Sequence, residues 1–188
     1  MDSHTESARF AVVDVETSGL SLRRSHVLQI GVVLLDEKFC VIHRWSSLVR
    51  PRHRWFFRVG PTRVHGLRRR DLRAAPPGPN VLQQLATLTS DATVVAHNAA
   101  FDTAFLAKSA KRNHVELSLG TPICTLKLSR GLDPSRQLSH RLADVCARYD
   151  VPLVRAHDAL SDAEATAGVL PHLLRAHEAF AGDQLPAS

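Results

Sequence analysis

The fold is decided by the stretch Phe10-Ala11-Val12-Val13-Asp14-Val15-Glu16-Thr17-Ser18-Gly19-Leu20. The run from Arg9 to Val15 is short and apolar, which is typical of a buried strand, and Ser18-Gly19-Leu20 is typical of a turn after it. Asp14 and Glu16 lie two residues apart at the end of the run. Because residues i and i+2 of a strand point to the same face, we expect both carboxylates to project together.

These two carboxylates suggest a cation. Like charges at the end of a buried strand repel each other and cost free energy unless positive charge lies between them. Hard oxygen ligands suit Mg²⁺ or Mn²⁺ rather than zinc. The alternative is a solvated strand end, where Asp, Thr, Ser and Gly are common turn formers. The pair alone leaves both interpretations open.

The rest of the chain predicts a mixed α/β sheet. Two further β-rich runs, His26–Leu35 and Phe39–Val49, flank Asp36-Glu37-Lys38, which predicts a hairpin. The segment Arg50–Pro79 contains five of the ten prolines and is expected to be mostly loop. Later strands are expected at Thr93–Ala96 and Pro122–Thr125, and helices at about Val81–Leu88, Ala99–Arg112, Leu138–Tyr149 and Ala159–His177.

This order of elements predicts one layered architecture. Three consecutive strands favour an antiparallel meander, and the later alternation of strand and helix favours parallel additions to the same sheet. We therefore expect a five-stranded mixed sheet, three strands antiparallel and two parallel, flanked by helices. Residues 9–177 are expected to form a single domain, with residues 1–8 and 178–188 as flexible tails.

Composition narrows the class of protein. The chain has 188 residues, of which 44% are hydrophobic and 22% charged, as in globular domains. It contains no apolar run near the roughly 18 to 20 residues of a membrane span, and its polar N-terminus does not resemble a secretory signal. Cys40, Cys124 and Cys146 stand in apolar contexts, which predicts buried, reduced thiols. We expect a cytoplasmic protein without a membrane partner.

Positive charge is concentrated in one segment. Between Arg50 and Arg73 there are nine arginines against a single acid, Asp71, whereas the whole chain carries a net charge of +6. A cluster of this kind is typical of a surface that contacts phosphates. The alternative is that arginines simply decorate solvated loops, since arginine greatly outnumbers lysine throughout the chain.

Two more segments combine histidine with a carboxylate. In His97-Asn98-Ala99-Ala100-Phe101-Asp102, Asn98 is expected to cap a helix and Asp102 to lie in its first turns. In the segment from His157 to Asp162, the acid again falls in the first turns of a helix and the histidine precedes it. Acids near helix N-termini are favourable without any catalytic role. The final helix has a face of small residues, which allows close packing on a sheet and brings Asp162 towards Asp14.

Together these segments resemble the DEDDh group of 3′→5′ exonucleases, which includes the proofreading epsilon subunit of bacterial DNA polymerase III. The resemblance covers roughly Arg9 to Leu174 and implies a ribonuclease H-like fold. Val64-His65-Gly66-Leu67 also resembles a family segment that lies beside the bound 3′ nucleotide. The motifs are Asp14-Val15-Glu16-Thr17-Ser18-Gly19-Leu20, His97-Asn98-Ala99-Ala100-Phe101-Asp102, and His157 followed after five residues by Asp162.

The resemblance implies a role for each site residue. Asp14 is expected to bridge two divalent metal ions, Mg²⁺ or Mn²⁺, with Glu16 and Asp162 completing one site and Asp102 supporting the other ion. His157 is expected to be the general base, since a histidine with a pKa near ~6.5 can take a proton from water at neutral pH. The residues assigned to the terminal nucleotide are Thr17, Leu20, Val64, His65, Asn98 and Phe101.

Some assignments have alternatives. Leu20, Val64 and Phe101 could equally belong to the core. Trp55-Phe56-Phe57 could stack on bases, but anchoring a long loop is the favoured interpretation. Asp158 receives no role.

The expected substrate is a single-stranded or frayed 3′ end of nucleic acid. DNA is favoured, as in proofreading or repair, and a DNA polymerase is a candidate partner. An RNA-trimming exonuclease, similar to RNase T or oligoribonuclease, shares the same catalytic residues. A non-catalytic nucleic-acid-binding module is a candidate of another class, although all five catalytic positions are filled.

Overall fold

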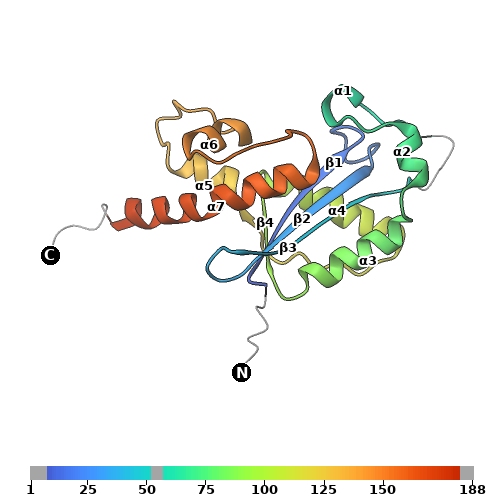
Figure 1. The fold of residues 1–188 in the computed structure, drawn as a ribbon, viewed down its shortest axis with the longest axis horizontal. Helices are drawn as coiled ribbons and strands as arrows, with labels where there is room; N and C mark the ends of the chain where they lie inside the picture. The colour runs from blue at the N-terminus through green and yellow to red at the C-terminus, as the bar shows by residue number, and fades with distance from the viewer. Residues whose placement is uncertain (1–7, 52–56, 183–188) are drawn as a thin grey trace.

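The computed structural model describes residues 8–51 and 57–182 (Figure 1). Within them, one five-stranded sheet is covered by helices on both faces. In chain order the elements are β1 (Phe10–Thr17), β2 (Val27–Leu35), β3 (Val41–Leu48), α1 (Thr62–His65), α2 (Arg69–Ala74), α3 (Gly78–Thr89), β4 (Thr93–Ala96), α4 (Ala99–Asn113), β5 (Ile123–Cys124), α5 (Thr125–Gly131), α6 (Leu142–Arg148) and α7 (Ala159–Gly182).

The sheet confirms the expected mixture of pairings. Its strand order is β3-β2-β1-β4-β5; β1, β2 and β3 are antiparallel neighbours, whereas β4 runs parallel to β1 and β5 parallel to β4. The predicted hairpin joins β2 to β3, and the Asp36 carboxylate accepts hydrogen bonds from the backbone N–H groups of Lys38 and Cys40, both at 2.8 Å. The strand that carries Asp14 is thus central.

The two faces of the sheet bury different sets of β1 side chains. Ala11, Val13 and Val15 pack in the core formed with α3 and α4. Val12 packs in a second core with β2, β4 and α7, which lies across the other face (Figure 1). Because side chains alternate along a strand, Asp14 and Glu16 share the α7 face with Val12. Strand periodicity therefore aims both carboxylates towards the helix that carries Asp162.

A glycine allows α7 to approach the sheet closely. Gly31 of β2 is paired with Asp14, and a Cβ atom at position 31 would lie 2.3 Å from the backbone carbonyl oxygen of Ala159, the first residue of α7. Only a residue without a side chain fits under that backbone. Gly31 therefore determines how near the start of α7 comes to β1.

A second glycine fixes the segment between β3 and α2. Gly60 has φ +82°, a region that favours glycine, and a Cβ atom there would lie 2.2 Å from the carbonyl oxygen of Ser18. The turn after β1 and the segment before α1 are therefore in direct backbone contact. This contact brings Val64 and His65 of α1 to the end of β1.

The structure corrects several predicted boundaries. The segment Arg50–Pro79 is less irregular than expected, because it contains α1, α2 and the start of α3. α2 is stabilised at its start by a 2.8 Å hydrogen bond from the backbone N–H of Arg68 to the carboxylate of Asp71, and Leu72 anchors it in the core. Leu72 packs there with Leu28 and Phe57.

Three later helices also differ from expectation. The predicted fifth strand keeps only two residues, and α5 follows it at once. α6 begins at Leu142, later than expected, because residues 133–140 form a loop organised around Asp133. α7 continues to Gly182, so residues 178–182 extend the helix rather than form part of a tail.

Other side-chain predictions have mixed outcomes. Phe57 is buried, as the anchoring interpretation expects, whereas Trp55 and Phe56 lie outside the described residues. All three cysteines are free, but only Cys146 is buried; Cys40 is exposed because it follows the β2–β3 turn at the sheet edge. None of the described helices combines the length and the apolar character needed to cross a membrane.

Candidate active site

A pocket of about 410 Å³ lies at the carboxyl end of β1. All eleven residues predicted to act in catalysis or substrate binding line it, although they come from β1, the turn after it, α1, α4 and the start of α7. The pocket is lined by Asp14, Val15, Glu16, Thr17, Gly19, Leu20, Pro61, Val64, His65, His97, Asn98, Phe101, Asp102, His157 and Asp162. The structure therefore brings every predicted site residue to one place.

Four carboxylates converge on this pocket. Asp14 and Glu16 project from β1, and Asp102 and Asp162 lie in the first turns of α4 and α7. Asp102 is buried, and its Oδ1 atom accepts a 3.3 Å hydrogen bond from the backbone N–H of Val15. This hydrogen bond holds the start of α4 against β1 at Val15, the residue between Asp14 and Glu16.

The carboxylates raise one another's pKa values. Burial, followed by the charges of Asp102, Asp162, Glu16 and Asp158, raises the pKa of Asp14 well above its ordinary value. Burial, with the charges of Asp162 and Asp158, raises the pKa of Glu16 to about 8. Burial raises the pKa of Asp102 to about 7 and also raises the pKa of Asp162. Without a cation, the cluster therefore retains protons near neutral pH.

The cluster suits a divalent cation. One oxygen each of Glu16 and Asp162 and one ring nitrogen of His157 lie within 4.8 Å of one another. The Oδ1 atom of Asp162 is buried, and it has no hydrogen-bond partner among the described residues. A buried carboxylate oxygen without a partner is unfavourable unless a cation or a proton satisfies it. The donors are mostly carboxylate oxygens, which are the ligands of Mg²⁺ and Mn²⁺.

His157 adopts a backbone conformation that is unusual for a histidine. Its φ is 65°, and its backbone N–H donates a 3.1 Å hydrogen bond to the Oδ2 atom of Asp162. Asp162 thus holds the loop that carries His157. The imidazole is exposed at the mouth of the pocket, close to the carboxylates of Glu16 and Asp162.

Asp158 has structural contacts that sequence reasoning did not assign. Its Oδ1 atom accepts a 3.2 Å hydrogen bond from the backbone N–H of Ser161, which caps the start of α7, and its Oδ2 atom accepts one from Gln29 at 3.3 Å. Its charge also raises the pKa values of Asp14 and Glu16. Asp158 is therefore a fifth carboxylate of the cluster, and it holds α7 to β2.

Two apolar residues of the pocket, Leu20 and Val64, are not core residues. Leu20 is 86% exposed and Val64 is 45% exposed, so both present apolar surface to solvent at the pocket. Phe101 is half-buried, and its ring lies 4.7 Å from the ring of Phe105. The core interpretation is wrong for Leu20 and Val64, since core residues would be shielded.

Two polar residues of the pocket have defined local geometry. Thr17 donates a hydrogen bond from its hydroxyl to the carbonyl of Gly19 at 2.9 Å. Asn98 precedes α4 as expected, but the prediction of a side-chain cap is wrong, because Asn98 is in the left-handed conformation (φ 72°) and its side chain makes no capping hydrogen bond. Asparagine tolerates this conformation better than most residues do.

His65 is held as a neutral imidazole. Its Nδ1 atom accepts a 3.1 Å hydrogen bond from the backbone N–H of Leu67, so its Nε2–H donates to the carbonyl of Val59 at 3.2 Å. Burial lowers its pKa, and the nearby charge of His157 lowers it further. Both ring nitrogens are therefore used to shape the segment that carries Val64.

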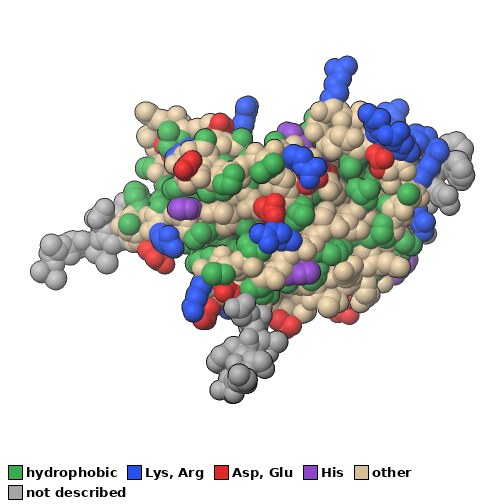
Figure 2. All heavy atoms as spheres, viewed as in Figure 1, with side chains coloured by type: hydrophobic (Ala, Val, Ile, Leu, Met, Phe, Trp, Pro, Cys, Tyr) green, Lys and Arg blue, Asp and Glu red, His purple; other side chains and the backbone are tan. Residues whose placement is uncertain are grey.

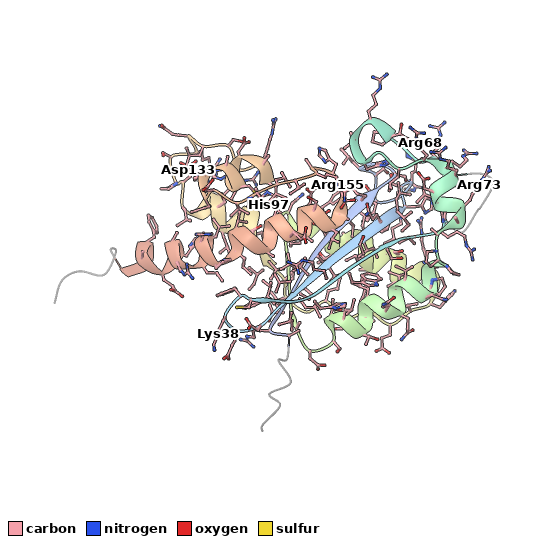
Figure 3. All side chains as sticks on the ribbon, viewed as in Figure 1. Lys38, Arg68, Arg73, His97, Asp133 and Arg155 are labelled. Carbon is pink, nitrogen blue, oxygen red and sulfur yellow. The ribbon has the colours of Figure 1, made fainter. Side chains whose placement is uncertain are left out.

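His97 lines the pocket although it was not singled out as a site residue. Its Nε2–H donates to the carbonyl of His140 at 3.0 Å, and its Nδ1 atom accepts from the hydroxyl of Thr125 at 2.9 Å. Burial lowers its pKa. His140 in turn contacts Asp133, since its Nε2 atom lies 3.2 Å from the Asp133 carboxylate. His97 and Asp133 are both labelled in Figure 3. The sequence could have indicated His97, because it is the first residue of the predicted site segment that ends at Asp102.

Arginines of the predicted basic segment gather at one end of the molecule. Figure 2 shows Lys and Arg side chains grouped where Figure 1 places α1 and α2, and Arg68 and Arg73 are labelled there in Figure 3. Some of these charges have structural partners. Arg69 donates a 2.7 Å hydrogen bond to the carbonyl of Phe57, and Arg70 lies 3.5 Å from the carboxylate of Asp71. Arg52 and Arg54 lie outside the described residues.

Comparison with known proteins identifies relatives with nuclease and polymerase functions. A family described as Exonuclease (RNase T) matches residues 11–170. The PolC-type DNA polymerase III of Oceanobacillus iheyensis is 32% identical over 168 residues, which cover 88% of this chain and 11% of the relative. The same enzyme of Streptococcus pyogenes is 31% identical over 175 residues, covering 93% of this chain and 12% of the relative. The chain thus spans only a small part of these relatives.

Solved structures share the fold. E. coli exonuclease I in complex with a dT13 oligonucleotide superimposes with a TM-score of 0.78 at 16% identity, over 93% of this chain and 42% of that chain. Another exonuclease I structure gives a TM-score of 0.77 at 18% identity, over 90% of this chain and 43% of that chain. These likenesses confirm the ribonuclease H-like fold. The family match over residues 11–170 shows that the chain belongs to the exonuclease family, as its three motifs predicted.

Proposed function

We propose that this protein is a metal-dependent 3′→5′ exonuclease that hydrolyses phosphodiester bonds from the 3′ end of DNA. The observation that carries the proposal is the convergence of Asp14, Glu16, Asp102, Asp162 and His157 on one pocket. Carboxylates from β1, α4 and α7 meet there, and their mutual repulsion destabilises the fold. Such an unfavourable cluster is typical of a functional site.

The four carboxylates are the residues that would hold two divalent ions, Mg²⁺ or Mn²⁺. Their raised pKa values and the unpartnered oxygen of Asp162 support this assignment. When bound, such ions lower the pKa of water and neutralise charge on the attacking and leaving oxygens. The charges of Asp102, Asp162 and Glu16 all act on Asp14, which supports a role for Asp14 in holding both ions.

His157 is the proposed general base. Its exposed ring at the pocket mouth can accept a proton from an attacking water and release it to solvent. The hydrogen bond from its backbone to Asp162 keeps the ring beside the carboxylates. This hydrogen bond thus joins the proposed base to one proposed metal ligand, Asp162.

The rim of the pocket fits one terminal nucleotide. Leu20, Val64 and Phe101 offer apolar surfaces for a base, as stacking and packing of a single unpaired base require. The backbone of Thr17 and the side chain of Asn98 offer polar groups for the 3′-hydroxyl. His65 contributes by shaping this rim, because both of its ring nitrogens are already bonded to backbone.

DNA is the favoured substrate because two kinds of similar protein act on or bind it. The PolC-type relatives are DNA polymerases, and exonuclease I has been seen with a dT13 oligonucleotide. A DNA polymerase stays a predicted partner.

The direct test uses short oligonucleotides labelled at the 5′ end. A 3′→5′ exonuclease produces a ladder of shortened labelled products with Mg²⁺ or Mn²⁺ and none with EDTA, whereas cleavage from the other end releases a labelled mononucleotide at once. Parallel DNA and RNA strands, single and duplex, separate proofreading or repair from RNA trimming. An Asp14→Asn variant prepared in the same way controls for contaminating nuclease. Tight binding without metal-dependent shortening would show a binding module instead.

A further inference from the structure

A basic groove lies beyond the turn that follows β1. Two adjoining cavities, of about 230 and 300 Å³, share Arg50, Pro51, Arg112 and Asn113 in their walls. The groove is formed by α4, the residues before and at the start of β2, the segment after β3, and the start of α3. We call it the cationic groove, after Arg50, Lys108 and Arg112.

The charges that line the cationic groove have one sign. Arg50, Lys108 and Arg112 line it, together with His26 and His114, and no Asp or Glu is among its described lining residues. Arg112 is partly used in the fold, since it donates a 3.2 Å hydrogen bond to the carbonyl of Arg23. A concave surface whose charged side chains are all cations concentrates anions.

Lys108 is a cation of the groove without a hydrogen-bond partner among the described residues. Its side chain is half-buried, and its ammonium nitrogen is closed off from solvent. Burial and the charge of Arg112 lower its pKa. An ammonium removed from water without a partner is unfavourable, and a bound anion would relieve it.

The start of α3 adds positive potential. Gly78 and Pro79 line the groove, and α3 is twelve residues long, with no acid in its first turn and no side-chain hydrogen bond at its cap. The N-terminus of a helix attracts negative charge through its free N–H groups and its dipole. A Cβ atom at Gly78 would lie 3.0 Å from the side-chain oxygen of Asn113, so glycine permits this close junction with α4.

The cationic groove directly adjoins the candidate active site. Phe101 lines the active-site pocket and Phe105, one turn later, lines the groove, with ring centroids 4.7 Å apart. Gly19 lines the pocket and Ser25 the groove, and the Ser25 hydroxyl lies 3.0 Å from the position of a Cβ atom at Gly19. One aromatic pair and one short turn separate the two.

We propose that the cationic groove is a second phosphate-binding subsite, which holds the nucleic-acid strand a few nucleotides upstream of the 3′ end that lies in the active site. The inference rests on the proposed function for the identity of the strand. It assigns Arg50, Lys108 and Arg112 to the phosphodiester backbone, so the subsite adds affinity without reading sequence.

The test measures binding without hydrolysis. Fluorescence anisotropy in EDTA compares a labelled dinucleotide with a single strand of about 12 nucleotides, a length in the range of single-strand binding sites. We expect Lys108→Met and Arg50→Ala to weaken the long strand about tenfold, to reduce the salt dependence by about 0.7 per lost phosphate contact, and to leave the dinucleotide unchanged. Lys111→Ala is the matched control, since Lys111 is exposed on α4 and does not line the groove.

A second readout separates binding from folding. Methionine keeps the apolar stem of Lys108 and removes its unpartnered charge, so Lys108→Met should raise the Tm of the free protein while weakening the long strand. Unchanged affinity for the long strand, or equal weakening of dinucleotide and long strand, overturns the proposal. A third result would also overturn it: inorganic phosphate raises the Tm of the protein, but Lys108→Met leaves the affinity for the long strand unchanged. The groove would then bind a free anion rather than the nucleic-acid strand. If the groove variants behave as expected but no oligonucleotide is shortened, only the proposed function is wrong.

Discussion

His157 combines a left-handed backbone with the proposed role of general base. Because asparagine adopts this conformation readily, His157→Asn keeps the loop geometry and the hydrogen bond to Asp162 while removing the imidazole. We expect kcat to fall by about 10²- to 10⁴-fold, the usual contribution of a general base. Affinity for Mn²⁺ and for an oligonucleotide should stay within a few-fold, as measured by calorimetry.

The control is His43→Asn, which changes an exposed histidine of β3 outside the pocket. Turnover of His157→Asn at the wild-type rate would remove His157 from the reaction. Loss of metal binding in the same variant would instead make the imidazole a ligand.

A conservative change at Asp158 separates the effect of its charge from the effect of its hydrogen bonds. Asp158→Asn keeps an oxygen for the hydrogen bond from Ser161, and asparagine caps helices as well as aspartate does. It removes one negative charge from the cluster, so the metal-free protein should gain about 1 kcal/mol and roughly 2 to 4 °C in Tm near pH 8.

The measurement is thermal unfolding in EDTA at about pH 5 and pH 8, because the gain needs ionised neighbours and should vanish at the lower pH. Turnover with saturating Mg²⁺ should change little. A lower Tm at both pH values would mean that the contact with Gln29, rather than the charge, dominates the contribution of Asp158.

At the scale of elements, Gly31 couples β2 to the start of α7. An added Cβ atom meets the Ala159 carbonyl at 2.3 Å, so Gly31→Ala must displace α7 or β2. We expect a loss of about 1 to 3 kcal/mol, the usual effect of overpacking. Because Asp162 moves with α7, kcat should fall by about 10²-fold, as expected for displacement of a catalytic group by about 1 Å.

Urea unfolding and single-turnover kinetics measure the two effects. Gly120→Ala is the control for the added methyl group, because a Cβ atom at Gly120 meets nothing within 4 Å, and its positive φ (54°), which Gly31 lacks, makes any backbone strain greater there. If Gly31→Ala keeps full activity, α7 can shift without moving Asp162, and the close approach is not what places this carboxylate.

Gly60 makes the corresponding contact on the substrate side. Its Cβ atom would meet the Ser18 carbonyl at 2.2 Å, and its φ of +82° disfavours any other residue. Gly60→Ala should push the segment with Val64 and His65 away from β1 while leaving the carboxylates in place. We therefore expect KM to rise by about tenfold with a smaller change in kcat, the pattern of lost uniform binding. A fall in kcat with unchanged KM would show that α1 acts on the chemistry instead.

The elements predicted correctly are those with strong periodicity. β1, β2, β3, β4, α4 and α7 follow apolar patterns that the tertiary structure leaves intact. α1, α2 and α5 are short, and contacts far apart in sequence stabilise them, such as the packing of Leu72 against Leu28. The predicted cap at Asn98 is wrong because asparagine suits both a capping geometry and a left-handed backbone, and the turn from β4 into α4 selects the left-handed backbone.

At the scale of the whole molecule, the site could be predicted because its residues occur along the chain in the order in which the topology of the fold brings their elements together. Strand alternation places Asp14 and Glu16 on one face, but only parallel pairing of β4 with β1 brings Asp102 to the same end of the sheet. The position of Asp162 depends on the close approach of α7 that Gly31 allows. Neither the sequence of β2 nor that of α7 alone predicts this contact. The cationic groove was missed for the same reason, since Arg50 and Lys108 meet only in the folded chain.

The carboxylate cluster also makes the stability of the whole molecule depend on pH and metal. The folded state raises the pKa of Glu16 to about 8 and of Asp102 to about 7, and raises those of Asp14 and Asp162 as well. A native state that binds more protons than the unfolded chain is most stable below the ordinary carboxyl pKa of about 4, and it loses stability as pH rises through the raised values. The metal-free protein should therefore become steadily less stable between about pH 4 and pH 8.

A bound divalent cation reverses this dependence, because it binds the ionised carboxylates and competes with protons for them. The Tm difference between Mn²⁺ and EDTA should be small near pH 5 and widen to several degrees by about pH 8. Differential scanning fluorimetry across this range measures it, and Glu16→Gln, which removes a titrating carboxyl and a ligand together, should flatten the curve. A metal effect of equal size at all pH values would mean that the cation binds elsewhere, because binding to the buried carboxylates must displace protons in this range.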